Sequence, residues 1–237
     1  MWGYYDYVPV SEKKKRAQKK LKKLQKKNPD IKPVIVEGRA IAKTFWGISW
    51  NKNLASYADY SNRIGRGRSY VKNGLILDLQ IKECEVSGLV YGSSGEVYSV
   101  NIEIAKFPEK KWKKILKSCS HQIESMEKLI SGVFPKELKE SFLQKGEGLF
   151  PNSDEIVMSC DCYDYATMCK HVSAILYGVG ARLDSEPMLF FTLRGIDSKE
   201  LLAKTVEEKI QDMIKNSDRK TSRMMDEDDI SELFRIE

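Results

Sequence analysis

Three cysteines and a histidine stand close together in the sequence and carry the side chains of a metal site. Cys160 and Cys162 are separated by one residue, and after six intervening residues Cys169 and His171 repeat that spacing. Zinc prefers four tetrahedral nitrogen or sulfur ligands, and a catalytic zinc usually keeps one position for water. Because four protein ligands close the site here, the pattern predicts one structural Zn2+ rather than a catalytic ion.

Other side chains fit this role less well. The loop carboxylates Asp161 and Asp164 are harder ligands than thiolate or imidazole, so they rank below them for zinc. Cys84 and Cys119 stand in apolar patterns typical of buried cysteines, and His121 is interpreted as a helix residue. Two alternatives stay open for the Cys-x-Cys pair: small buried apolar residues, or a redox pair. A histidine in this motif, in a chain that has only two, favours the metal.

The flanking sequence predicts elements that bring the four ligands together. An apolar strand over residues 156–158 precedes the first pair, and residues two apart in a strand point to the same side. Cys160 and Cys162 can therefore aim both sulfurs at one point. An apolar helix over residues 172–179 follows the second pair, and amide hydrogens at its N-terminus favour the thiolate of Cys169.

Upstream of the motif, hydrophobic periodicity predicts a helix, three strands and further helices. Trp46 and Trp50 lie four apart on a helix expected to end near residue 58, and an Arg/Gly-rich segment over 63–70 follows. Short apolar alternations separated by glycine turns predict a three-stranded antiparallel meander. The strands are expected at residues 75–81, 84–91 and 97–104. Residues 108–145 have the pattern of helices.

Together these elements predict an α+β fold: a small antiparallel β-meander with helices, followed by a β-turn-α zinc finger and a C-terminal helix. Whether the region before the finger shares one core with it stays open. The chain divides into a basic leader (1–33), a mixed α+β N-terminal region (34–150), the zinc finger (151–196), a packing helix (197–216) and an acidic C-terminal tail (217–237).

The positive charge is concentrated in the leader. The net charge of the chain is +6, yet residues 12–27 hold ten Lys or Arg and one Glu, a net +9 that leaves −3 for the remainder. Two interpretations of the leader stay open. It is either a solvated, partly helical tail, or an arm whose lysines bind nucleic acid by releasing counterions from phosphates.

Composition argues against several classes of protein. No stretch approaches the roughly 18 consecutive apolar residues of a membrane helix, and the first residues lack the order of a cleavable signal peptide. An odd number of cysteines, five, with three of them within ten residues, does not fit a secreted disulfide framework. We therefore expect an intracellular, cytoplasmic protein in a reducing compartment, without a membrane partner.

Residues 160–172 resemble the SWIM zinc finger, in which Cys-x-Cys, a short gap and Cys-x-His precede an apolar helix. The similarity to bacterial members extends over roughly residues 34–210. One departure concerns the loop, where family members often have Pro after the second cysteine and Trp two residues further on. This chain has Tyr163 and Tyr165 there, which changes the surface of the loop and not its ligands. Further similar segments are residues 45–47, 66–70, 74–79, 149–151, 177–184 and 187–195.

The resemblance implies a domain for DNA or protein interaction, and bacterial relatives often accompany Snf-type helicase-like ATPases. We therefore expect a non-enzymatic zinc-binding adaptor for DNA, for such an ATPase, or for both. Arginine pairs bidentately with phosphates and tyrosine stacks on bases, although a solvated turn is the alternative for the Arg/Gly-rich segment. The candidate contact residues are Arg63, Arg66, Arg68, Tyr70, Lys72, Tyr163, Tyr165 and Lys170.

Two further hypotheses remain. In the first, the protein is a pure protein–protein scaffold without nucleic-acid contact, and the apolar residues of its acidic tail dock a partner; these are Ile230, Leu233, Phe234 and Ile236. In the second and least favoured, it is a carboxylate-based hydrolase. No P-loop, Gly-rich dinucleotide turn or zinc-deaminase motif is present in the sequence, so we expect no enzyme and no small-molecule substrate.

Overall fold

The computed structural model describes residues 8–57, 61–119, 142–144 and 146–197, and a few positions beyond. The chain divides into two compact units, Met1–Ser198 and Lys199–Glu237. In the second unit the described positions 203, 206, 207, 210, 211 and 214 are helical, as expected for the predicted helix over 197–216. The predicted acidic tail and the part of the helical region over 120–141 lie outside the described residues.

Four antiparallel strands form a single sheet in the order β1-β2-β3-β4. The first three are the predicted meander, and they confirm the α+β class. The fourth strand comes from the predicted zinc finger and pairs with β3, so that Cys160 lies opposite Val100. The metal motif therefore begins on the central sheet. The strands are β1 (Ile76–Lys82), β2 (Glu85–Tyr91), β3 (Val97–Ile104) and β4 (Ile156–Cys160).

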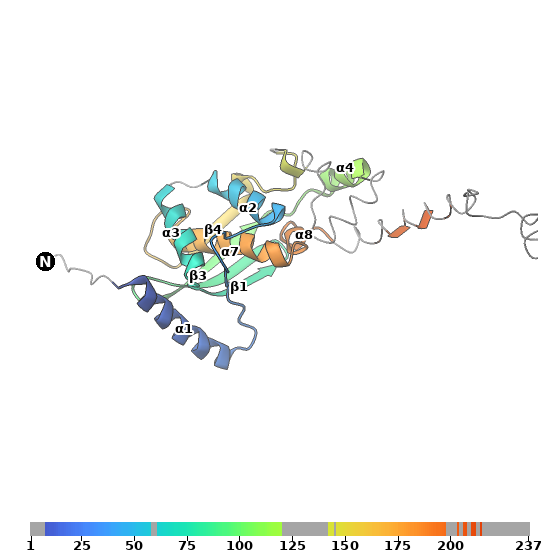
Figure 1. The fold of residues 1–237 in the computed structure, drawn as a ribbon. Helices are drawn as coiled ribbons and strands as arrows, with labels where there is room; N and C mark the ends of the chain where they lie inside the picture. Colours follow the sequence, from blue (N-terminus) through green and yellow to red (C-terminus); the bar gives the residue numbers. More distant parts are fainter. Residues whose placement is uncertain are drawn as a thin grey trace, which may run out of the picture. The chain divides into compact units, whose positions relative to one another are not determined.

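Helix α7 (Lys170–Ser185) packs on one face of this sheet (Figure 1). Gly88 in β2 permits the close approach, because a Cβ atom there would lie 2.2 Å from Cδ1 of Ile175. On the same side of the sheet, α2 (Phe45–Ala55) and α3 (Ser61–Lys72) pack against α7. The core of the protein thus lies between the sheet and these helices.

Hydrogen bonds attach α2 to α7, and aromatic rings attach it to α8. Asp184 accepts hydrogen bonds from the backbone N–H of Thr44 at 3.0 Å and from its hydroxyl at 2.7 Å, which places the start of α2. The indole Nε1 of Trp50 donates to the carbonyl of Leu176 at 2.8 Å. Trp46 is fully buried and its ring lies 5.1 Å from that of Phe190 in the short helix α8 (Leu189–Leu193).

A buried arginine joins α8 to the segment before β4. Arg194 has no exposed surface, and its guanidinium donates to the carbonyl of Ala105 at 2.8 Å and to Glu155 at 2.9 Å. Glu155 ends a single 3-10 turn (Ser153–Glu155) directly before β4. Helix α4 (Glu109–Cys119) follows β3, as the sequence predicts.

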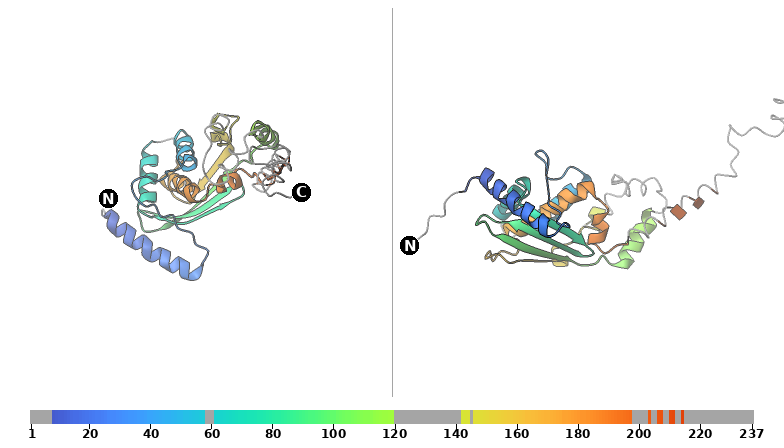
Figure 2. Two further views of the ribbon diagram at one scale, coloured as in Figure 1. Left: turned by 45° about the vertical axis from the view of Figure 1, so that its right-hand side comes forward. Right: turned by 90° about the horizontal axis from the view of Figure 1, so that it is seen from below.

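Helix α1 (Val10–Lys27) contacts part of the other face of the sheet, and Figure 2 shows it on the side opposite to α7. Ala17 is completely buried against Leu75, Leu77 and Tyr91, with Leu21 and Leu24 packed beside it. The leader therefore differs from a solvated tail. Its three apolar residues suffice because the outward side chains of β1 and β2 provide a matching apolar surface.

The Arg/Gly-rich segment over 63–70 is helical, which corrects the expectation of one helix to residue 58 followed by a turn. Helix α2 ends at Ala55, and α3 spans Ser61–Lys72. Gly67 explains the composition, because a Cβ atom there would lie 2.2 Å from Oγ of Ser173 in α7. The glycine serves close packing between helices and lowers helix propensity in the process.

Candidate metal centre

The three thiols and the imidazole of the predicted motif meet in one place. The Sγ atoms of Cys160, Cys162 and Cys169 and a ring nitrogen of His171 all lie within 4.8 Å of one another. Cys169 and His171 are buried, and the other two cysteines are partly buried. This Cys3His group is able to hold one metal ion, and its donor set is the one that zinc prefers.

Each ligand is placed by a different part of the fold. Cys160 is the last residue of β4, and Cys162 follows in the loop. Cys169 is the N-cap of α7, where its sulfur accepts the backbone N–H of Val172 at 3.4 Å. His171 lies in the first turn of the same helix. The predicted strand–loop–helix arrangement is therefore present in the structure.

The electrostatics of the three thiols favour a cation between them. A hydrogen bond from the Cys160 thiol, helped by His171 and by the N–H of Val172, lowers the pKa of Cys169 to about 4. The same hydrogen bond raises the pKa of Cys160, while burial is the main cause that raises the pKa of Cys162. Three thiolates this close repel one another, so a divalent cation is required for all three to ionise.

Two tyrosines orient the imidazole of His171. The ring of Tyr98 in β3 stacks on it at a centroid distance of 4.3 Å and an angle of 18°, and Tyr70 of α3 meets it edge-on at 5.7 Å. Nδ1 of His171 lies 3.8 Å from Sγ of Cys160. Nδ1 therefore faces the thiols, whereas Nε2 is buried and has no hydrogen-bond partner among the described residues.

Two carboxylates hold the loop that connects the cysteine pairs. Asp164 forms a salt bridge with Arg63 of α3, with 3.0 Å between Oδ2 and Nε, and it also accepts the N–H of Ala166 at 3.3 Å. Asp161 accepts the N–H of Ser99 in β3 at 3.0 Å. These carboxylates anchor the loop to α3 and β3, which agrees with their low rank as metal ligands.

The structure separates the predicted contact residues into several groups. Tyr163 and Tyr165 are exposed on the loop, and Lys170 is partly buried at the start of α7. Arg63 holds the loop, and Tyr70 packs against the metal-binding histidine.

Three cations of α3 remain on the surface, namely Arg66, Arg68 and Lys72. The guanidinium of Arg68 lies 5.0 Å from the centre of the Tyr177 ring.

Sequence reasoning missed Tyr98. The alternation of β3 does carry a signal, since Tyr98 shares its strand face with Val100 and Ile102, which point toward α7. Nothing in the sequence, however, says which α7 residue lies opposite. That contact depends on the register between β3 and β4, where Cys160 pairs with Val100.

Comparison with known proteins finds a homologue. The chain is 32% identical over 186 residues to the uncharacterized protein Rv2102 of Mycobacterium tuberculosis. The aligned region covers 74% of this chain and 66% of that protein, slightly less than two thirds of its length. No family model matches the chain. No solved structure matches it. Among the described residues, no helix combines the length and apolar character needed to cross a membrane.

Proposed function

We propose that the protein is a non-enzymatic adaptor of the SWIM zinc-finger type that binds single-stranded DNA through the loop between its cysteine pairs. The observation that carries the proposal is the exposure of Tyr163 and Tyr165, whose relative accessibilities are 91% and 104%. Stacking on bases is a sequence-tolerant use of such aromatic side chains and contributes about 1–3 kcal/mol per base. Duplex DNA offers no unstacked bases, so the tyrosines favour a single strand.

The loop is held in position for this role. The metal ligands Cys162 and Cys169 flank it, and the salt bridge from Arg63 to Asp164 ties its middle to α3. Zinc, when bound, supplies only a closed tetrahedral link between these ligands, without a position for a reacting water. Tyr163 and Tyr165 flank Asp164 on either side, so the salt bridge restrains the backbone between them.

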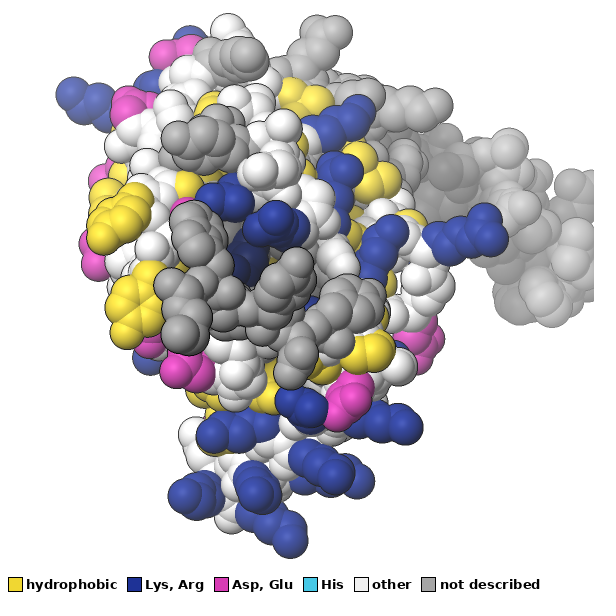
Figure 3. Space-filling view, turned by 90° about the vertical axis from the view of Figure 1, so that its left-hand side faces the viewer, with side chains coloured by type: hydrophobic (Ala, Val, Ile, Leu, Met, Phe, Trp, Pro, Cys, Tyr) yellow, Lys and Arg dark blue, Asp and Glu magenta, His cyan; other side chains and the backbone are white. Residues whose placement is uncertain are grey.

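Helix α1 adds a basic surface. It docks through Ala17 and leaves its lysines pointing away from the sheet, with Glu12 as its one acidic residue. Figure 3 shows Lys and Arg side chains along this helix at the bottom of the face and others gathered above it. Such a surface gives salt-dependent affinity without sequence specificity.

A Snf-type helicase-like ATPase is the partner class that the SWIM resemblance supports. An adaptor that holds a single strand is compatible with an ATPase that moves along DNA. The acidic tail, which the scaffold hypothesis uses for docking, lies outside the described residues, and that hypothesis stays a prediction.

A salt series tests the DNA proposal. We expect the zinc-loaded protein to bind a labelled oligothymidine of 20 nucleotides in fluorescence anisotropy, and to bind the duplex form more weakly. Replacing Tyr163 and Tyr165 together by Ala removes stacking, so affinity should fall at least tenfold, about 1.4 kcal/mol, with an unchanged salt slope.

Replacing four exposed lysines of α1 by Gln should change the salt dependence of binding, which the tyrosine variant leaves unchanged. Each lost phosphate contact lowers the slope of log K against log salt by about 0.7 for a single strand. The four are Lys15, Lys19, Lys22 and Lys26. Exchange of Lys110 and Lys114 on α4 for Gln removes surface charge away from α1 and should leave both the affinity and the salt slope unchanged. No binding at low salt, or a tyrosine variant that binds like the wild type, contradicts the proposed function.

A further inference from the structure

A cavity of about 380 Å³ lies beside the helices that support the metal centre. Its walls are residues 39–42, α2, α3 and Tyr177 of α7. This volume falls in the range of small-molecule sites, about 300–1,000 Å³. None of the residues that line the cavity belongs to the metal-binding loop, so the cavity is separate from the surface of Tyr163 and Tyr165.

The charged residues that line this cavity are all cations. Arg39, Lys52, Arg68 and Lys72 line it, and no carboxylate does. None of the four forms a salt bridge with another residue in the described part of the chain. Arg68 and Lys72 are one helical turn apart on α3, where like charges repel. A bound anion between them would offset this repulsion.

The arrangement of the cations suits a phosphate group. The ring of Tyr177 lies 5.0 Å from the guanidinium carbon of Arg68 and so restrains an otherwise long side chain. Arginine offers a planar fork of donors that fits phosphate oxygens, and lysine adds a point charge. Lys52 of α2 lines the same cavity as Arg68 and Lys72 of α3. Donors on two elements can therefore surround one phosphate.

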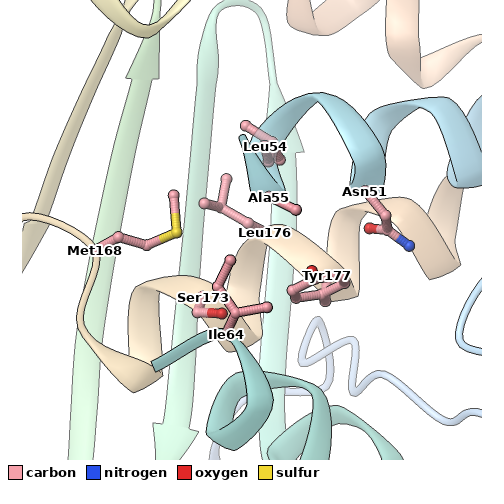
Figure 4. Close-up of a pocket in the computed structure, with 8 residues that line it drawn as sticks. All are labelled: Asn51, Leu54, Ala55, Ile64, Met168, Ser173, Leu176 and Tyr177. Atoms are coloured by element: carbon pink, nitrogen blue, oxygen red, sulfur yellow. The ribbon is translucent and has the colours of Figure 1, made fainter. Parts of the chain in front are cut away.

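Apart from Asn51 and Tyr177, the rest of the lining is apolar. Alanines and isoleucines of residues 39–42 and of α2, such as Ile48, complete the wall. On the inner side, Figure 4 shows Asn51 of α2 and Tyr177 of α7 beside Leu54, Ile64 and Leu176, where the gap between the helices leaves no room for a water molecule. A ligand thus stays near the surface, with its anionic part on the cations and an apolar part on the wall.

We propose that this cavity binds the phosphate of a nucleotide, with Arg68, Lys72, Lys52 and Arg39 around the phosphate and the apolar wall beneath the base. The same chemistry comes from two sources, a free nucleotide or a nucleotide within a strand. This inference goes beyond the adaptor function, because it concerns a different surface and two cations, Arg39 and Lys52, that have no role there.

Calorimetric titration of the full-length, zinc-loaded protein tests the inference with two probes, ADP and a 5′-phosphorylated oligothymidine of 12 nucleotides. The cavity variant carries Lys52→Gln and Lys72→Gln, both at exposed positions. The matched control carries Lys110→Gln and Lys114→Gln on α4, with the same change of charge. Circular dichroism checks that both variants keep the wild-type melting behaviour.

We expect the cavity variant to bind at least one probe about tenfold or more weakly than the wild type, because charge-assisted contacts to phosphate are lost, and the control to differ less than twofold. If the cavity variant binds ADP more weakly than the control does, the phosphate comes from a free nucleotide. If ADP does not bind and the cavity variant binds the oligonucleotide more weakly than the control does, the phosphate comes from a nucleotide within a strand. If neither probe binds the wild type, or if the cavity variant binds both probes like the control, the inference is overturned.

The test of the cavity and the test of the adaptor function can fail independently of each other. Oligonucleotide binding that depends on Tyr163 and Tyr165 but not on Lys52 and Lys72, together with ADP binding that is absent or equal in the cavity variant and the control, supports the adaptor function and overturns this inference. If the protein binds no oligonucleotide but binds ADP in a way that depends on Lys52 and Lys72, this inference is supported and the adaptor function is contradicted.

Discussion

The imidazole of His171 is oriented by aromatic rings in the described structure. Tyr98 stacks on it at 4.3 Å and Tyr70 meets its edge at 5.7 Å. A ligating histidine usually has its second nitrogen hydrogen-bonded to a carboxylate, carbonyl or water, and this sets the ring orientation. Because Nε2 of His171 has no partner among the described residues, the stacked ring takes over this role.

Replacing Tyr98 by Leu should therefore weaken zinc binding. Without the stacked ring the imidazole gains rotational freedom, and loss of an orienting partner typically costs at least about tenfold in metal affinity. Competition with a chromophoric chelator measures the change. Tyr98→Phe keeps the ring and should bind zinc within about twofold of the wild type. Equal affinities for the Leu and Phe variants would show that stacking does not orient the histidine.

At this scale, sequence reasoning succeeds where the chemistry is local. Cys160, Cys162, Cys169 and His171 lie within twelve residues, and their types and spacing suffice to identify them. The contacts of Arg63 with Asp164 and of Tyr98 with His171 join residues about 70 to 100 positions apart. Such pairs depend on tertiary packing, which no local pattern encodes.

Helix α3 connects the metal centre to the rest of the molecule. One side of it contributes Tyr70 and Arg63 to the metal-binding region, and Gly67 permits contact with α7. The sequence of this helix is a poor signal of a helix, because its two glycines lower helix propensity and its four basic residues leave few apolar positions to mark a buried face. Tertiary contact with α7 overrides that local preference, which is why the segment has the pattern of a turn.

Gly67→Ala should destabilise the protein, whereas Gly65→Ala should not. A Cβ atom at position 67 would lie 2.2 Å from Oγ and 2.6 Å from Cβ of Ser173, and overpacking of this kind costs about 1–3 kcal/mol. Position 65 has nothing within 4 Å, so Ala there should stabilise the helix by up to about 1 kcal/mol. Urea denaturation of both variants measures the free energy of unfolding. Equal effects would mean that α3 does not pack closely on α7.

The meander is the element that sequence reasoning predicts best. Buried and less buried positions alternate over most of β2 and β3, because α7 packs on one face of the sheet, and that alternation is visible in the sequence. Strand β4 is not assigned to the sheet from the sequence, because its pairing partners in β3 lie 52 to 60 residues earlier. The helical spacing of Ala17, Leu21 and Leu24 is visible in the sequence, but the docking of α1 on the sheet is not, because so thin an apolar stripe does not indicate a core position.

Ala17→Glu should release α1 from the sheet. A carboxylate in contact with Leu75, Leu77 and Tyr91 would be buried without a partner, so the helix undocks instead. Trypsin should then cleave at the lysines of α1 about tenfold faster or more, because cleavage follows the population of the open form. Gln18→Glu introduces the same residue at an exposed neighbouring position and should leave the cleavage rate unchanged. Identical cleavage of both variants would contradict docking by Ala17.

At the scale of the whole molecule, the metal centre joins two regions that the sequence treats as separate. Cys160 belongs to the sheet, while Cys169 and His171 belong to α7, which crosses the sheet and carries α2 and α3 on its side. The apolar core of α7, with Ile175 and Val179 fully buried, does not involve the metal. A metal ion held by these ligands would therefore connect the loop to a core that is stabilised mainly by apolar burial.

Removal of zinc should loosen one part of the molecule only. After treatment with a chelator, we expect amide hydrogen exchange over residues 160–171 to accelerate at least about tenfold, because the link that the metal forms between the two pairs of ligands is lost. Exchange at Val86 and Val90 in β2 should change little, since both are fully buried beneath α7. Elemental analysis of the untreated protein should give one zinc per chain.

Two variants separate this local effect from general destabilisation. Cys162→Ser removes one ligand and should reproduce the exchange pattern of the chelated wild type without any chelator. Cys84→Ser removes a cysteine outside the cluster and should retain one zinc and the slow exchange of the loop. If chelation accelerates β2 as strongly as the loop, the metal stabilises the entire core. If it accelerates neither, the four ligands do not hold the metal that closes the loop.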